Sequence, residues 1–138
     1  MSDNLLSRFL RYVRIDTQSD ENSNSFPSTP GQLVLLEMLK RELSELGAAD
    51  VQMTKHGYVI ASIPANTRKS CVPTVAFLAH VDTAPNSSGK DVKPVVHRKY
   101  DGRVIKFPDK PGLTLDLATS PKRGVERAES GRAPERQE

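Results

Sequence analysis

A histidine and an aspartate separated by one residue, His80 and Asp82, are the side chains in this sequence best suited to chemistry. They follow Val75–Ala79, a continuous apolar run typical of a strand that is buried on both faces. In open α/β sheets, ligands bind at the carboxyl ends of the strands, so the position of His80 and Asp82 after this run favours a ligand-binding site. Residues two apart on an extended chain share a face, which suits an imidazole ligand of zinc with a carboxylate beside it.

The spacing alone leaves a second interpretation open, in which His80 is a hydrogen-bonded core histidine and Asp82 is a turn residue. The remaining histidines are less well placed, because His56 lies beside a predicted turn and His97 lies in a polar stretch. We expect both on the surface. Cys71 is the only cysteine, which excludes an internal disulfide and favours a reducing compartment.

Two helices can be predicted upstream of the His80–Asp82 pair. Apolar residues between Leu5 and Val13 recur at helical spacing, with Ser2 or Asp3 as a possible N-cap. Thr29–Gln32 has the residue types of a second helix start, with a capping threonine, a proline at the first position and a glutamine that completes a capping box. The leucine stripe from Leu33 to Leu46 then predicts a core-facing helix, and Gly47 is its natural stop.

Short apolar or alternating runs predict the strands. The predicted strands are Val51–Met53, Tyr58–Ile63, Val75–Ala79, Val95-Val96 and Val104-Ile105. We expect His56-Gly57 to form the turn of a first hairpin and Tyr100-Asp101-Gly102 the turn of a second. The order helix, strand, strand, buried strand predicts an α/β fold with a layered sheet.

Length and composition limit the organisation of the chain. A chain of 138 residues has room for one domain. From Lys122 to Glu138 there are nine charged residues and only three apolar ones, too few to offset the entropy of ordering the segment. We therefore expect residues 1–117 to form the structured part and residues 118–138 to be a disordered tail.

The charge pattern excludes several classes of partner. The 20 basic and 17 acidic residues are interleaved, so no phosphate-binding stripe is apparent and a nucleic-acid partner is not expected. The first 18 residues contain Asp3 and Asp16 and no long apolar run, so we expect neither a signal peptide nor a membrane span. A cytoplasmic location is the expectation that fits best.

Residues 3 to about 106 resemble the N-terminal part of proteins of the peptidase T family. Members of this family are tripeptide aminopeptidases and belong to the dinuclear zinc peptidases. The stretches that carry the resemblance are Leu5–Val13, Asp16–Ser19, Pro27–Gln32, Pro64–Asn66, His80–Thr83 and Ser88–Pro94. His80–Thr83 alone would indicate only the wider zinc family, which includes carboxypeptidases and deacylases. The combination with Pro27–Gln32 and Ser88–Pro94 points to peptidase T.

The resemblance implies a fold and a set of roles. The fold would be the first part of a three-layer α/β/α catalytic domain. His80 would be a ligand of one of two zinc ions, and Asp82 would be the catalytic aspartate that holds the geometry and charge beside the metal. The implied reaction is hydrolysis of the N-terminal peptide bond of a tripeptide, with the metals supplying Lewis acidity. The oligomeric state stays open.

The sequence also departs from the family. The Gly-Ala-Asp-Asp-Lys segment, the Glu-Glu pair and the later Asp and His ligands of full-length relatives are missing. We therefore expect an N-terminal fragment, from a truncated or frameshifted gene, that is catalytically incomplete and binds zinc weakly. The alternatives are a non-catalytic remnant or small interaction protein with an exposed sheet edge, and another member of the zinc family.

Overall fold

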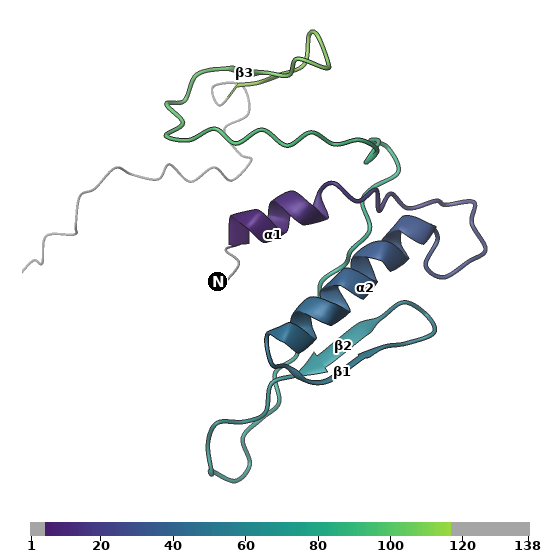
Figure 1. Cartoon of the computed structure of the whole chain (residues 1–138), viewed down its shortest axis with the longest axis vertical. Coiled ribbons are helices and arrows are strands. Elements are labelled where there is room, and N and C mark those ends of the chain that lie inside the picture. Colours follow the sequence, from purple (N-terminus) through teal and green to yellow (C-terminus); the bar gives the residue numbers. More distant parts are fainter. Residues whose placement is uncertain (1–4, 117–138) are drawn as a thin grey trace, which may run out of the picture. The chain divides into compact units, whose positions relative to one another are not determined.

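The computed structural model describes residues 5–116 (Figure 1). The chain divides into two compact units, Met1–Val95 and Val96–Glu138. The elements of the first unit are α1 (Leu5–Tyr12), α2 (Pro30–Glu45), β1 (Ala49–Met53) and β2 (Val59–Ser62), and those of the second are β3 (Ile105–Lys106) and β4 (Thr114–Leu115). This is a mixed α/β arrangement, as expected. The predicted caps Ser2 and Asp3 and the predicted disordered tail 118–138 lie outside the described residues.

Both predicted helices are confirmed, and α2 ends as its sequence indicates. Gly47 follows the helix with a φ of 81°, a left-handed conformation that favours glycine. Its N–H donates to the Ser44 carbonyl at 3.0 Å, and the N–H of Ala48 donates to the Leu43 carbonyl at 3.0 Å. These two bonds form a Schellman motif, which satisfies carbonyls that the end of the helix would leave unpaired. No helix within residues 5–116 has the length and apolar character needed to cross a membrane.

The core of the first unit lies between α2 and the β1–β2 hairpin. Leu35 and Leu36 are buried there, whereas Leu33 and Leu46, at the two ends of the predicted stripe, are exposed. The prediction that the whole stripe is core is therefore wrong at its ends, because a hairpin of two short strands cannot cover a helix of 16 residues.

The first predicted hairpin is confirmed. Strands β1 and β2 are antiparallel, with Ala49 opposite Ser62 and Met53 opposite Val59. The turn between them closes at Gly57, whose φ is 77°. A methyl group at Gly57 would lie 2.6 Å from Cγ of Pro27, so the hairpin turn packs closely against the loop that precedes α2.

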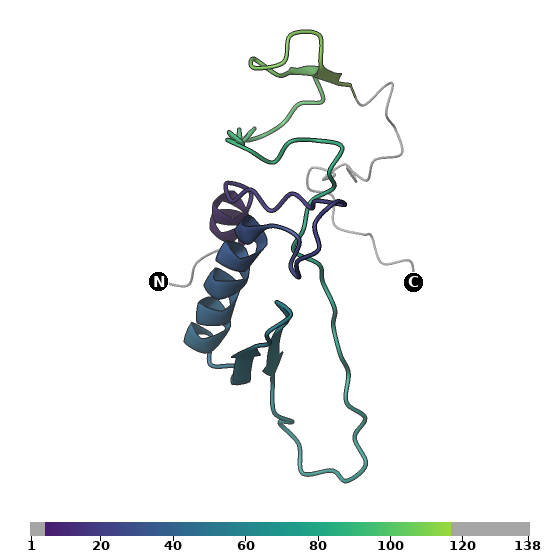
Figure 2. The same cartoon turned by 90° about the vertical axis from the view of Figure 1, so that its right-hand side faces the viewer.

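The predicted buried strand Val75–Ala79 is wrong for the described chain. These residues belong to no strand, and Val75, Phe77 and Leu78 are 71%, 95% and 95% exposed. Figure 2 shows the stretch as an extended ribbon that follows the loop after β2. A strand that is apolar on both faces needs a neighbouring strand and a layer on each side. Both sheets within residues 5–116 have only two strands, so a three-layer domain is not confirmed.

The second hairpin shares only Ile105 with the strands predicted for it. Val95-Val96 is not a strand, and Ile105 pairs with Leu115 while Lys106 pairs with Thr114. The residues of the expected turn form local hydrogen bonds and do not connect two strands. The hydroxyl of Tyr100 donates to the Arg103 carbonyl at 2.6 Å. The N–H of Arg103 also donates to Asp101 Oδ1 at 3.1 Å. Such side-chain bonds to the backbone compete with a strand ladder.

Helices α1 and α2 are joined by a cluster of Arg11, Tyr12 and Glu42. Nη2 of Arg11 lies 2.6 Å from Oε1 of Glu42, and the hydroxyl of Tyr12 donates to Oε2. Burial, the hydrogen bond to Glu42 and the charge of Glu42 raise the pKa of Tyr12 to about 12. Burial opposes ionisation of Glu42, but the hydrogen bonds from Tyr12 and Arg11 outweigh it, so the pKa of Glu42 is lowered.

We predict that Glu42→Gln lowers the free energy of unfolding by about 1 kcal/mol at pH 7. Because the pKa of Glu42 is lowered on folding, its contribution is complete above the ordinary value of 4.5 and is lost as the pH falls below it. The difference between Glu42→Gln and the parent should therefore shrink at pH 3, as measured by urea unfolding. Glu37→Gln is the control, because Glu37 is exposed and pairs loosely with Lys40 at 3.9 Å. A constant difference across this range would contradict the prediction.

Candidate functional site

The structure brings the predicted pair into contact. Nδ1 of His80 lies 3.1 Å from Oδ1 of Asp82. A carboxylate accepts a hydrogen from Nδ1 in this geometry, and a neutral imidazole held in this way has the lone pair of Nε2 available for a metal. The two side chains are 84% and 44% exposed, so the alternative of a core histidine is wrong.

The residue after Asp82 anchors the pair to a distant loop. Thr83 lies opposite Gln18 in a parallel bridge. The N–H of Thr83 donates to the Thr17 carbonyl at 3.1 Å, and the Thr83 carbonyl accepts from the N–H of Ser19 at 2.9 Å. The hydroxyl of Ser19 adds a bond to the same carbonyl at 3.1 Å. Backbone bonds on both sides of Thr83 therefore fix the chain next to Asp82.

The start of α2 supports the same loop. Thr29 is the N-cap residue, as predicted, but its side chain makes no capping hydrogen bond. Its hydroxyl donates instead to the carbonyl of Gln18 at 2.9 Å. The side chain of Gln32 is buried and donates to the Ser28 hydroxyl at 3.1 Å. The predicted capping box is therefore wrong, because these side chains bond to the loop and not to the helix end.

Two glycines allow close approaches at this junction, by a backbone carbonyl at Gly31 and by side chains at Gly89. A Cβ atom at Gly31 would overlap the carbonyl oxygen of Asp16 and lie 3.0 Å from its carbonyl carbon. A Cβ atom at Gly89 would lie 2.8 Å from Oδ1 of Asp16 and 3.5 Å from Oγ1 of Thr83. Four of the stretches that carry the family resemblance (16–19, 27–32, 80–83 and 88–94) thus meet at Asp16–Ser19 and Thr83, the residue that follows Asp82.

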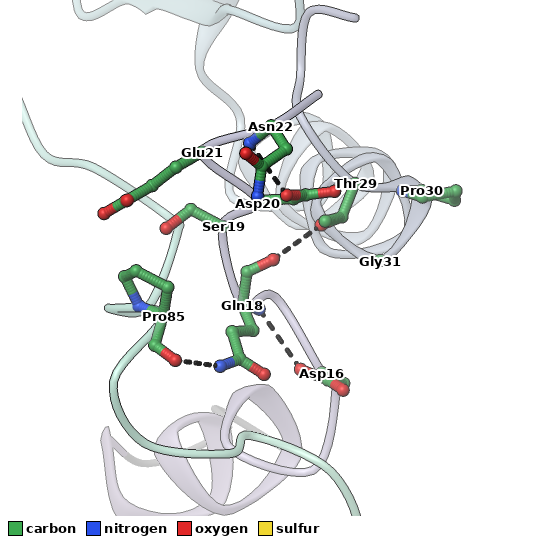
Figure 3. Close-up of a pocket in the computed structure, with 10 residues that line it drawn as sticks. All are labelled: Asp16, Gln18, Ser19, Asp20, Glu21, Asn22, Thr29, Pro30, Gly31 and Pro85. Atoms are coloured by element: carbon green, nitrogen blue, oxygen red, sulfur yellow. Dashed lines mark hydrogen bonds between the residues drawn. The ribbon is translucent and has the colours of Figure 1, made fainter. Parts of the chain in front are cut away.

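An open cavity of about 650 Å³ lies beside this junction (Figure 3). Its lining residues are Asp16, Gln18, Ser19, Asp20, Glu21, Asn22, Thr29, Pro30, Gly31 and Pro85. Three carboxylates give it a negative potential. His80 and Asp82 are not among its lining residues, so the cavity and the pair are separate features.

The ligands present do not complete a metal site. A catalytic zinc ion normally has three protein ligands. Residues 5–116 contain no group of three or more His, Cys, Asp or Glu side chains that could hold a metal ion. His56 and His97 are exposed, as predicted, and Cys71 is an exposed free thiol. At the candidate site the described residues therefore provide one imidazole, from His80, and one neighbouring carboxylate, from Asp82.

Comparison with known proteins shows which proteins share these motifs. The chain is 50% identical over 115 residues to peptidase T of Bacillus velezensis, which covers 83% of this chain and 28% of that protein. It is 47% identical over 129 residues to peptidase T of Bacillus licheniformis, which covers 94% of this chain and 30% of that protein. Most of this chain is homologous to a part of peptidase T. Peptidase T of Caldanaerobacter subterraneus subsp. tengcongensis is 47% identical over 117 residues, or 85% of this chain. The resemblance inferred from the motif stretches is thus confirmed.

The match to peptidase T has a clear limit. The chain spans less than a third of the length of these relatives, between 28% and 30%. No protein-family model matches the chain.

Sequence reasoning did not find the residues that support the pair. Thr17 and Gln18 lie in a matched stretch, yet nothing in their spacing indicates bonds to Thr83 and Pro85, more than 60 positions away. The available signal was Gly31 at the second position of a helix, where alanine would be the better helix former. A glycine at such a position indicates that another backbone comes close.

Proposed function

We propose that this chain forms the opening part of the catalytic domain of a peptidase T-type aminopeptidase, which removes the N-terminal residue from tripeptides. The observation that carries the proposal is an identity of 47–50% over 83–94% of the chain. The contact between His80 and Asp82 supports it. In this proposal residues 1–117 belong to the catalytic domain and residues 118–138 form a separate tail.

His80 is proposed as a ligand of a zinc ion and Asp82 as the carboxylate that orients the imidazole and adds negative charge beside the metal. A bound zinc pair would supply Lewis acidity to the reaction. Since the described residues provide only these two groups, the other ligands must come from outside residues 5–116.

The exposed stretch Val75–Ala79 has a place in the same proposal. Its apolar side chains alternate between both faces of an extended chain, the pattern of a strand inside a three-layer sheet. We propose that it becomes such a strand when the rest of a peptidase T domain is present. A cytoplasmic location is proposed with it, and the lone free thiol of Cys71 supports that location.

A chimera tests the proposed function. Residues 1–117 of this chain replace the matching stretch of Bacillus velezensis peptidase T, and hydrolysis of a tripeptide is followed with zinc present. We expect the chimera to cleave the N-terminal residue at a rate within about tenfold of the natural relative, because the His80–Asp82 pair supplies what the replaced stretch supplied. A chimera that folds and binds zinc but cleaves no tripeptide would refute the proposal.

A further inference from the structure

We propose that the hydroxyl of Thr29 positions the His80–Asp82 pair, acting through the carbonyl of Gln18 and the bridge between Gln18 and Thr83. Thr29 is a positioning residue, since no contact joins it to either member of the pair. The part of this inference that concerns catalysis rests on the proposed function. The part that concerns the bridge stands on the structure of this chain.

The side chain of Thr29, the N-cap residue of α2, makes an unusual hydrogen bond for its position. A threonine at this position normally accepts a hydrogen bond from a backbone N–H of the first helical turn. Thr29 has the extended backbone of an N-cap, with φ −137° and ψ 148°, but makes no such bond. Its hydroxyl is a donor to the Gln18 carbonyl at 2.9 Å, in a partly buried position. The side chain therefore stabilises the loop and leaves the helix start uncapped.

Gln18 is itself held in place by several hydrogen bonds. The N–H of Gln18 donates to Oδ1 of Asp16 at 3.1 Å, and its side-chain amide donates to the Pro85 carbonyl at 2.6 Å. Together with the bond from Thr29, these contacts hold the residue through its N–H, its carbonyl and its side chain (Figure 3). Gln18 is thereby tied to the start of α2 on one side and to the stretch after Thr83 on the other.

Thr83 connects the restrained loop to the His80–Asp82 pair. The residues on either side of Gln18, Thr17 and Ser19, supply the carbonyl and the N–H that bond to Thr83. Thr17 is buried, so this end of the bridge is shielded from water. Asp82 precedes Thr83 directly and holds the imidazole of His80 at 3.1 Å. A shift of Gln18 would therefore move the carboxylate, and a misplacement of about 1 Å is enough to lower catalysis strongly.

Amide hydrogen exchange in the full 138-residue chain tests the bridge. Thr29→Val keeps the shape of the side chain and removes the donor, and Thr29→Ser keeps the donor. In Thr29→Val we expect the amides of Ser19 and Thr83 to exchange about tenfold faster, while amides inside α2 such as that of Leu36 stay within about twofold. Thr29→Ser should restore the parent rates.

Two results of this measurement would overturn the inference. Unchanged exchange at Thr83 in Thr29→Val would mean that the hydroxyl does not hold the bridge. Faster exchange throughout α2, or a loss of its helical circular dichroism signal, would mean that the hydroxyl serves the helix.

Kinetics in the chimera test the link to catalysis. We expect Thr29→Val to lower kcat about tenfold at an unchanged KM for the tripeptide, and Thr29→Ser to restore kcat. An unchanged kcat alongside faster exchange at Thr83 would overturn the positioning role. An inactive parent chimera would count against the proposed function alone, and the exchange rates would still decide whether Thr29 holds the bridge.

Discussion

Replacing His80 by alanine in the chimera is expected to lower the rate of tripeptide hydrolysis by more than about 100-fold. The proposed ligand would be lost, and the described residues contain no third group beside Asp82 that could take its place. Zinc content, measured by elemental analysis after dialysis, should fall with the activity. A drop in both quantities is expected because a catalytic zinc ion depends on each of its few protein ligands.

His97→Ala is the matched control for this prediction. His97 is also exposed and lies in the second unit, where its ring is 6.4 Å from that of Tyr100. The control should keep its activity within about twofold, as expected for a surface substitution. Equal losses in the two variants, or full activity in His80→Ala, would show that the imidazole of His80 is not a metal ligand.

The elements that sequence reasoning predicted correctly are those with local signals. Helix α2 begins at Pro30 and ends before Gly47, and both residues act through their own backbone geometry. The turn at Gly57 likewise needs only a residue that accepts a positive φ. The contact of His80 with Asp82 is local as well, since the two residues are two positions apart.

The elements that it missed depend on partners far away in the sequence. Whether Val75–Ala79 is a strand depends on neighbouring strands that residues 5–116 do not supply, and periodicity cannot reveal that. The hydroxyl of Thr29 could either accept a hydrogen bond from an N–H of the first turn of α2 or donate one to the carbonyl of Gln18. Propensity favours the helix, and tertiary packing selected the loop. The support of the candidate site was therefore hidden, although its two chemical groups were not.

Gly31 offers the most direct test of this packing, because it is where the start of α2 touches the loop that holds Thr83. In an exposed helix, replacing glycine by alanine stabilises by up to about 1 kcal/mol. At Gly31 the added methyl group would overlap the carbonyl oxygen of Asp16, a backbone atom that cannot rotate away. The overlap should outweigh the gain in propensity, so we expect Gly31→Ala to lower the free energy of unfolding by about 2 kcal/mol in urea titrations.

Gly89→Ala separates this effect from a general intolerance of the junction. The added methyl group would lie 2.8 Å from Oδ1 of Asp16, a side-chain atom that also accepts the N–H of Gln18. A carboxylate can rotate where a backbone carbonyl cannot, so the loss should stay below about 1 kcal/mol. Ser44→Ala, on the exposed part of α2, should change the stability by less than about 0.5 kcal/mol. If Gly31→Ala proved as stable as Ser44→Ala, the loop could not lie against the start of α2, and Thr29 would be too far from Gln18 to position anything.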